Sequence, residues 1–398
     1  MNIVWQSNQF QSTSIPTTVF NSFKPSNLEQ VLNFQSTLPN YSQTPLYHLD
    51  NLAKHLGVAS IDVKDESKRF DLNAFKGLGG AYAMASYFAQ KLNLDLGNIT
   101  FNKLMEVIKD LEPVTFATVT AGNHGKGVAW AAKTFGQKVK VVLPKGSSVE
   151  RLTAIQDLGA EAYISDLNYD DAVVEIAKQS DEQGWILLQD TAWVDYETLP
   201  LAIMQGYSTI VAELIKQLDR KHISQYTHVI LQAGVGSFAA AVIASIYNQT
   251  VPDPPKFIIV EPNKADCIFT SIKSNDGIPK RVNGPLDSMM AGLACGEPST
   301  IAWEILKPTI QATFSCKDVI SSIGMKQYAN PLNNDRSIIS GESGALPLGV
   351  LIEIMTSKAL FNAKDSLKLD NSSNILLINT EGNTNPKNYD DIIHNKLF

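Results

Sequence analysis

Lys76 is the residue of this sequence best suited to covalent chemistry. It lies in the run DLNAFKGLGG at residues 71–80, in which three glycines follow it within four positions. Glycines let the backbone turn tightly and let a flat ligand approach closely, and the alanine-rich stretch after them favours a helix. Only a neutral amine condenses with an aldehyde, and burial lowers the pKa of a lysine toward neutrality. A solvated lysine at a helix start is the alternative reading of this segment.

A second glycine-rich turn, AGVGSF at residues 233–238, follows an apolar run at residues 228–232 and precedes a stretch of small residues. Backbone N–H groups and the dipole of a helix N-terminus bind a dianion, and the hydroxyl of Ser237 can add a donor. No fitting acidic partner indicates a dinucleotide, and a tight turn without any ligand remains open. The candidate cradle for a single phosphate consists of Gly234, Val235, Gly236, Ser237 and Phe238.

A third turn, TAGNHG at residues 120–125, again lies between an apolar run and a helical stretch. Amides at a helix terminus can hold a carboxylate, and the Asn123 side chain can hydrogen-bond a ring substituent. An Asn-Gly turn with a packed histidine is the alternative. The candidate substrate-binding residues here are Thr120, Ala121, Gly122 and His124. A reactive lysine, a phosphate cradle and a carboxylate loop together are what pyridoxal 5′-phosphate chemistry on an amino acid requires.

Parallel β-sheets are expected to position these turns. Short apolar runs alternate with helical stretches from residue 59 onward, which is typical of buried strands in α/β proteins. The predicted strands cover residues 60–64, 114–119, 138–143, 161–164, 185–188, 228–232, 256–260 and 374–378. Ligands of open α/β sheets bind where strands end and helices begin, so the glycine-rich turns should face one cleft.

The length of 398 residues exceeds the usual limit for one core and predicts two domains. A large domain is expected from residues 1–90 plus 208–398, with residues 1 to about 40 forming an irregular arm. A small domain is expected to be inserted at residues 91–207. The order strand, glycine-rich turn, helix and strand within residues 110–190 supports that insertion.

Composition excludes several classes of protein. Apolar residues make up 44% and charged residues 18%, and the net charge is −7, so nothing indicates nucleic acid or an anionic membrane as a partner. Three dispersed cysteines predict neither a disulfide framework nor a metal site. No signal peptide or run of 18 apolar residues is evident, which predicts a cytoplasmic protein. A small molecule is the expected partner.

The motifs around the three turns resemble those of fold-type II pyridoxal-phosphate enzymes, the tryptophan synthase β-like group. Within this group the sequence is most similar to the diaminopropionate ammonia-lyase family. The resemblance is carried by NAFKG at 73–77, PKGSS at 144–148, QDTAW at 189–193, IMQGY at 203–207, SMMAGLACGEP at 288–298 and NTEGNTNP at 379–386. It implies two open, twisted, mostly parallel sheets flanked by helices. It also implies a homodimeric lyase of amino-acid catabolism that converts 2,3-diaminopropionate to pyruvate and two molecules of ammonia.

The same resemblance implies roles for individual residues. Lys76 matches the lysine that binds the cofactor as a Schiff base and takes the Cα proton. Asn123 matches the residue that contacts the 3′-oxygen of the cofactor, and Thr380 occupies the place of a hydroxyl beside the pyridine nitrogen. Asp190 matches an acid near the substrate amino group, although it could instead cap the following turn.

One position departs from the family pattern. Where diaminopropionate ammonia-lyases typically carry an aspartate that serves as a second base, this chain has Ala121. Alanine cannot accept a proton, so we expect Lys76 to be the only Cα base and the L-isomer the only substrate. An L-serine or L-threonine dehydratase is the alternative, and a protein that binds the cofactor without turnover is a further one.

Two of the cysteines, Cys267 and Cys295, lie in strings that resemble the family and are expected near the cleft. A disulfide between them stays open, although cytosolic thiols are normally reduced.

Overall fold

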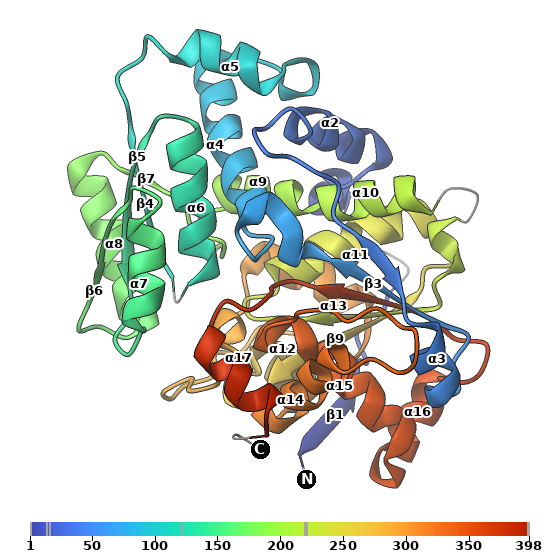
Figure 1. Ribbon diagram of the computed structural model, residues 1–398. Coiled ribbons are helices and arrows are strands. Elements are labelled where there is room, and N and C mark those ends of the chain that lie inside the picture. The colour runs from blue at the N-terminus through green and yellow to red at the C-terminus, as the bar shows by residue number, and fades with distance from the viewer. Residues whose placement is uncertain (1, 13–14, 16, 121, 219–221, 396–398) are drawn as a thin grey trace.

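The computed structural model describes residues 2–12, 15, 17–120, 122–218 and 222–395. Within this part, the chain forms a seven-stranded and a four-stranded sheet, both flanked by helices (Figure 1). The predicted fold class, α/β with two mostly parallel sheets, is confirmed.

The larger sheet has five parallel central strands and an antiparallel strand at each edge. Chain order and spatial order differ at β1 and at β11, which lies between β8 and β3. The strands, in spatial order, are β1 (Ile3–Ser7), β10 (Ile310–Cys316), β9 (Lys256–Pro262), β8 (His228–Gln232), β11 (Asn374–Asn379), β3 (Ser60–Asp65) and β2 (Leu46–His48).

The smaller sheet is parallel throughout. Its strands, in spatial order, are β6 (Glu161–Ile164), β5 (Lys138–Leu143), β4 (Thr115–Val119) and β7 (Ile186–Leu187). All four lie within the predicted small domain, and the strands of the larger sheet lie outside it. The boundaries at residues 90 and 207 stay a prediction.

Helices cover both sheets. The α-helices are α1 (Thr17–Asn21), α2 (Pro25–Gln35), α3 (Asp50–Leu56), α4 (Gly77–Leu92), α5 (Phe101–Ile108), α6 (Asn123–Thr134), α7 (Val149–Gln156), α8 (Tyr169–Gln183), α9 (Thr198–Tyr207), α10 (Thr209–Gln217), α11 (Ser237–Thr250), α12 (Cys267–Ser274), α13 (Thr300–Thr309), α14 (Asp318–Ala329), α15 (Glu342–Thr356), α16 (Phe361–Leu367) and α17 (Pro386–Ile393). Short 3₁₀ helices are η1 (Glu66–Asp71), η2 (Leu96–Asn98), η3 (Ile223–Gln225), η4 (Ala291–Leu293) and η5 (Lys358–Leu360).

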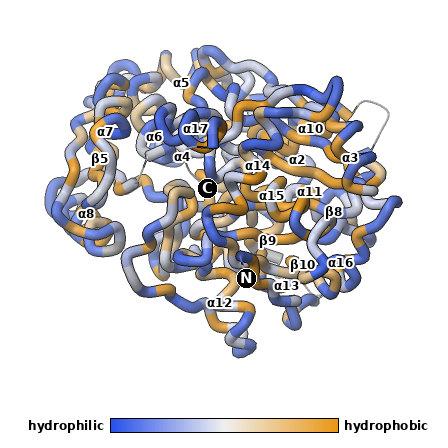
Figure 2. The backbone as a smooth tube through the Cα atoms, turned by 60° about the horizontal axis from the view of Figure 1, so that its bottom comes forward, coloured by the Kyte–Doolittle hydropathy of each residue, from blue (hydrophilic) through white to orange (hydrophobic). Residues whose placement is uncertain are grey.

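The central strands are apolar on both faces because each face meets a layer of helices. In β11, Leu376 and Ile378 belong to one buried apolar cluster, which includes residues of α2, α9, α10, α11 and α13, whereas Ile375 and Leu377 belong to a second one, which includes residues of α3, α14, α15 and α16. This period of two is the geometry of a strand buried on both sides. In Figure 2 the most hydrophobic stretches gather around α11, α15 and nearby strands, and hydrophilic stretches lie mostly toward the outside.

The N-terminal segment corrects one expectation. Residues 1 to about 40 were expected to be irregular, but they include β1, which pairs antiparallel with β10, and α2, an eleven-residue helix with a buried face. Strands β2 and β10 were not predicted either. The other eight predicted strands are present, and β7 is shorter than expected.

The segment Thr198–Gln217, which comprises α9 and α10, is long and apolar enough to cross a membrane by length and composition. However, 72% of its most hydrophobic window is buried inside the protein. It packs against α2, α4 and α11, which is the position of a core helix.

Candidate active site

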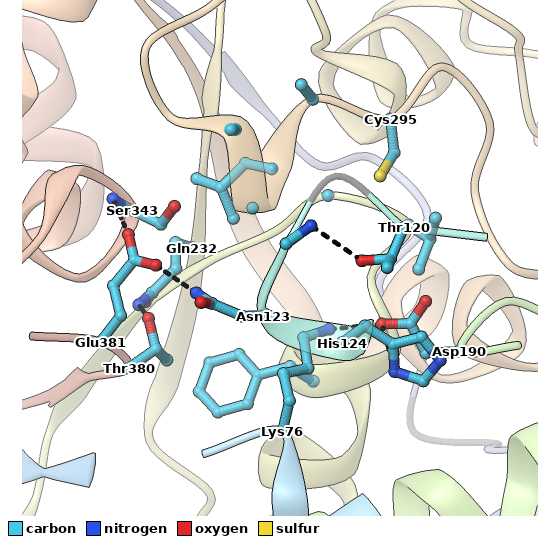
Figure 3. Close-up of a pocket in the computed structure, with 18 of the residues that line it drawn as sticks. Lys76, Thr120, Asn123, His124, Asp190, Gln232, Cys295, Ser343, Thr380 and Glu381 are labelled. Atoms are coloured by element: carbon cyan, nitrogen blue, oxygen red, sulfur yellow. Dashed lines mark hydrogen bonds and ion pairs between the residues drawn. The ribbon is translucent and has the colours of Figure 1, made fainter. Parts of the chain in front are cut away.

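The three glycine-rich turns meet at one cavity between the two sheets (Figure 3). The predicted residues that line it are Lys76, Thr120, Gly122, Asn123, His124, Asp190, Gly234, Val235, Gly236, Ser237, Phe238 and Thr380. Ala121 lies outside the described residues. The structure therefore brings together residues from five distant segments, as expected for turns at the ends of parallel strands.

Lys76 stands immediately before α4 and is held there by close contact between two helices. Gly127 of α6 faces its backbone, and a Cβ at Gly127 would lie 2.6 Å from the carbonyl carbon of Lys76. Only glycine permits this approach. The ε-amine lies 5.2 Å from the centre of the Phe75 ring and 5.7 Å from that of Tyr207. The lysine is thus aimed into the cavity by packing on its own backbone.

A buried ion cluster fixes the segment that leads to Lys76. Lys64 of β3, Glu66 and Arg69 of η1, and Glu213 of α10 are each at most 1% exposed at their side chains. The guanidinium of Arg69 bonds Glu213 at 2.7 Å and Glu66 at 2.9 Å, while the Lys64 amine bonds Glu213 at 2.7 Å. Two positive and two negative charges balance, which is the condition for burying such groups.

The amine of Lys76 forms an ion pair with the carboxylate of Asp190. Burial lowers the pKa of Lys76, but the negative charge of Asp190 outweighs burial, and the pKa is raised above its ordinary value. We expected burial to lower it toward neutrality, so that expectation is wrong for the protein without cofactor. The competing effect is the carboxylate, which favours the charged amine.

The carboxylate of Asp190 is itself strongly perturbed. Burial raises its pKa, but His124 and Lys76 beside it outweigh burial and hold the pKa at about 2. Burial lowers the pKa of His124, whose Nε2 bonds the Leu188 carbonyl oxygen at 2.9 Å. Because a carbonyl only accepts, Nε2 carries the proton and Nδ1, 3.7 Å from Asp190, faces the carboxylate. Asp190 is therefore a carboxylate at neutral pH.

The second turn has the geometry of a phosphate cradle. Helix α11 begins at Ser237, so the N–H groups of its first turn have no carbonyl acceptor within the helix. Gly236 before it has a φ of +93°, a conformation that favours glycine. The Ser237 hydroxyl donates to the backbone oxygen of Asp190 at 2.7 Å. We expected the Ser237 hydroxyl to donate to a phosphate, but in this structure it donates to Asp190. The group that Ser237 can offer to a phosphate is therefore its backbone N–H.

Thr380 follows β11 and lies opposite the amine side of the cavity (Figure 3). Gln232, the last residue of β8, donates from Nε2 to the Thr380 hydroxyl oxygen at 2.6 Å and to the Ile378 carbonyl oxygen at 3.2 Å. Since the hydroxyl oxygen accepts from Gln232, its proton is available for donation. Such a donor suits an unprotonated ring nitrogen.

Asn123, the first residue of α6, reaches across the cavity to Glu381 (Figure 3). Its side-chain N–H₂ donates to one carboxylate oxygen of Glu381, and the other oxygen accepts the N–H of Ser343 at 2.8 Å. From the sequence, we assigned no role in the site to Glu381 or Gln232. Two signals were available: Glu381 directly follows Thr380, and Gln232 directly precedes the second glycine-rich turn.

The two cysteines near the cleft lie on either side of Gly234. The Sγ of Cys267 is 3.5 Å from its carbonyl oxygen, and a Cβ at Gly234 would lie 3.4 Å from the Sγ of Cys295. Neither Cys267 nor Cys295 forms a disulfide in this structure, so the open alternative of a bond between them is not present. Burial raises the pKa of the Cys267 thiol well above its ordinary value.

The donor set fits pyridoxal phosphate. An amine for an aldehyde carbon, a helix N-terminus for one phosphate, a hydroxyl proton for a ring nitrogen and an amide for a ring oxygen all face one cavity. This is a complete set of contacts for that cofactor. The individual roles stay predictions.

Comparison with known proteins points the same way. A family model described as "Pyridoxal-phosphate dependent enzyme" matches residues 37–381. A diaminopropionate ammonia-lyase from Salmonella typhimurium is 46% identical over 369 residues, which cover 92% of this chain and 91% of that protein. One from Escherichia coli K12 is 44% identical over 371 residues, or 93% of this chain and 92% of that protein.

Solved structures show the same likeness. Holo diaminopropionate ammonia lyase from Escherichia coli has a TM-score of 0.90 at 41% identity, over 99% of this chain and 97% of that one. The same lyase in complex with D-serine gives the same values. A threonine deaminase from Solanum lycopersicum has a TM-score of 0.72 at 20% identity, covers 98% of this chain and 96% of that one, and shares the fold.

Proposed function

The chain belongs to the diaminopropionate ammonia-lyase family of pyridoxal-phosphate dependent enzymes, and from this premise we propose that it converts 2,3-diaminopropionate to pyruvate and two molecules of ammonia. The ion pair between Lys76 and Asp190, facing the phosphate cradle, is the observation that carries the proposal. It places a nucleophilic amine and an anion for a cationic substrate side by side.

Four groups of this chain would hold the cofactor. Lys76 would bind it covalently, the first turn of α11 would hold its phosphate, Asn123 its 3′-oxygen and Thr380 its ring nitrogen. When bound, pyridoxal phosphate supplies an electron sink for the charge left at Cα. A hydroxyl at the ring nitrogen makes this sink weaker than a charged partner would, which suits elimination.

The residues of the chain perform the proton chemistry. The amine of Lys76, in its neutral form, would take the proton as the Cα–H bond breaks. The Cβ–N bond then breaks and the β-ammonium departs as ammonia. Water hydrolyses the remaining enamine to pyruvate and a second ammonia. The N–H groups at the start of α6 orient the substrate carboxylate, so that the Cα–H bond faces Lys76.

Asp190 acts in this proposal as an anion that holds the β-ammonium. In the protein without cofactor, the charges of His124 and Lys76 outweigh burial and hold its pKa at about 2, so Asp190 is ionised at neutral pH. When Lys76 is neutral, Asp190 loses its positive partner and is free to pair with the ammonium group of the substrate. A cationic leaving group needs no further acid, since it departs as neutral ammonia.

We further propose that only the L-isomer is turned over. Position 121 carries alanine, which cannot take a proton from the opposite face. Glu381, a carboxylate among the described residues of the cavity wall, is engaged with Asn123 and Ser343. The Escherichia coli lyase forms a complex with D-serine, and in our proposal this chain binds a D-isomer as well but does not remove its proton.

The alternative of an L-serine or L-threonine dehydratase is not favoured. An L-threonine dehydratase from Salmonella typhimurium is 28% identical over only 58% of this chain. A cytoplasmic homodimer remains our expectation for the working form. Light scattering on purified protein tests the dimer.

A substrate panel tests the proposal. Cofactor-loaded protein is incubated with L- and D-2,3-diaminopropionate, L-serine and L-threonine, and pyruvate or 2-oxobutyrate is measured. The L-isomer of diaminopropionate should be the best substrate by kcat/KM, and Lys76→Ala should be inactive with all four. A higher kcat/KM for L-serine would replace the proposal with the dehydratase alternative.

A further inference from the structure

Glu381 is a buried carboxylate in the wall of the cavity, only 4% exposed. It directly follows Thr380. Two backbone hydrogen bonds hold this segment: the carbonyl oxygen of Glu381 accepts the N–H of Gly341 at 2.9 Å, and the N–H of Gly382 donates to the carbonyl oxygen of Asn73 at 2.9 Å. These backbone bonds hold in place the segment that carries both Thr380 and Glu381.

The two oxygens of Glu381 have different partners. One accepts the N–H of Ser343 in the first turn of α15 at 2.8 Å, and the other accepts the side-chain N–H₂ of Asn123 from α6 (Figure 3). An ionised carboxylate only accepts hydrogen bonds. It therefore selects the orientation of the Asn123 amide in which N–H₂, and not the carbonyl oxygen, faces it.

The amide of Asn123 has two N–H bonds, of which Glu381 takes one. We propose that Glu381 is a positioning residue that fixes the Asn123 amide so that its second N–H serves the 3′-oxygen of pyridoxal phosphate. The inference rests on the cofactor site of the proposed function and not on the identity of the substrate. An amide turned by 180° would place its carbonyl oxygen against the ring oxygen, and two acceptors repel each other.

A neighbouring carboxylate provides a matched control. Glu342, the first residue of α15, is 3% exposed, and burial together with the negative charge of Glu381 raises its pKa to about 7. Its side chain accepts from Asn388 of α17 and has no hydrogen bond to Asn123. Glu342→Gln replaces a buried carboxyl at the same helix N-terminus with an uncharged amide but leaves the Asn123 contact in place.

The test measures cofactor affinity by titrating apoprotein with pyridoxal phosphate and following visible absorbance. The amide of Glu381→Gln has one oxygen, whereas the carboxylate accepted from two donors. Either Asn123 or Ser343 would therefore place its N–H against the N–H₂ of glutamine, and two donors cannot bond each other. Affinity should fall roughly three- to tenfold, the effect of one hydrogen bond. Glu342→Gln should stay within about twofold of wild type. A loss as large in Glu342→Gln would indicate a charge effect and overturn the inference.

A double-mutant cycle isolates the positioning effect. Glu381→Gln should have little effect on affinity in an Asn123→Ala background, because the residue through which it acts is gone. Equal losses in both backgrounds, or none in either, would contradict the inference. Thermal unfolding of each apoprotein checks folding, and Glu381→Asp serves in the cycle if Glu381→Gln does not fold. Wild-type protein that binds no cofactor would instead refute the proposed function.

Discussion

The carboxylate of Asp190, three residues after β7, pairs with the ammonium of Lys76 at the start of α4. The two groups stabilise each other's charged forms, since the pKa of Lys76 is raised and that of Asp190 falls to about 2. In the protein without cofactor, Lys76 is therefore an ammonium. It must lose a proton before its amine can react with the aldehyde of the cofactor.

Asp190→Asn should therefore speed covalent attachment of the cofactor at neutral pH. Without the carboxylate, burial remains and lowers the pKa of Lys76, so the neutral amine becomes more abundant. The curve of attachment rate against pH should shift to lower pH, as measured by stopped-flow absorbance. An unchanged curve, or a shift to higher pH, would contradict this reading. Glu106→Gln, at the exposed Lys103–Glu106 pair, is the control.

The same variant should lose catalytic efficiency with diaminopropionate. The β-ammonium of the substrate would lose a charged hydrogen-bond partner, which reduces kcat/KM roughly 10- to 150-fold. The loss should be smaller with L-serine, whose β-hydroxyl carries no charge. Equal losses with both substrates would show that Asp190 does not hold the leaving group.

Glu213→Ala should destabilise the protein by about 3–5 kcal/mol, because it leaves the amine of Lys64 and the guanidinium of Arg69 buried with one carboxylate fewer. Urea unfolding of the apoprotein measures the change. Glu106→Ala breaks an ion pair whose two side chains are 64% and 63% exposed and screened by water, so it should change stability far less than Glu213→Ala. Similar values for both variants would refute the role of the buried cluster.

The contribution of Glu213 should also depend on pH. Burial raises its pKa, but the bonds and charge of Arg69 outweigh burial and lower the pKa from 4.5 to about 2. A carboxyl whose folded pKa is depressed stabilises the fold above its unfolded pKa and loses that contribution as pH falls through the folded one. The stability difference between wild type and Glu213→Gln should be constant above pH 4.5 and shrink toward pH 2. A stability difference that grows as the pH falls would contradict a lowered pKa for Glu213.

Thr380→Val should weaken cofactor binding roughly three- to tenfold, because it removes the hydroxyl proton offered to the ring nitrogen. Gln232 keeps its bond to the Ile378 carbonyl oxygen, so the strand end should stay in place. Thr380→Ser restores the hydroxyl and should restore affinity. A serine variant as weak as valine would show that the methyl group matters instead.

Ala121→Asp should confer turnover of D-2,3-diaminopropionate by supplying the missing base. Wild type should bind the D-isomer as a competitive inhibitor without releasing pyruvate from it. Pyruvate release from D-diaminopropionate by both proteins, with the L-isomer as reference, is the measurement. Efficient turnover of the D-isomer by wild type would contradict the proposed restriction.

Patterns that are local in sequence predicted most of the sheets. β8, β9 and β11 are continuous apolar runs, and such runs identify buried parallel strands. β1 was missed because it is an edge strand, in which only Ile3 is buried and pairing with Cys316 spans more than 300 residues. β10 was missed because Gln, Thr and Ser interrupt its apolar residues directly after a helix.

For the site, too, local patterns in the sequence predicted residues but not the contacts between them. Lys76, Asn123 and the Gly234–Phe238 turn lie in strings whose glycines and helix starts reveal them. The ion pair with Asp190 and the contact of Asn123 with Glu381 join residues 114 and 258 positions apart. Nothing local fixes such contacts, so the raised pKa of Lys76 could be found only from the folded structure.

The ratio of ammonia to pyruvate released from L-2,3-diaminopropionate tests the central claim most directly. Elimination followed by hydrolysis frees both nitrogens, so the cofactor-loaded protein should release two ammonia molecules per pyruvate, and Lys76→Ala should release neither product. No pyruvate from wild-type protein with bound cofactor, or undiminished release by Lys76→Ala, would contradict the assignment.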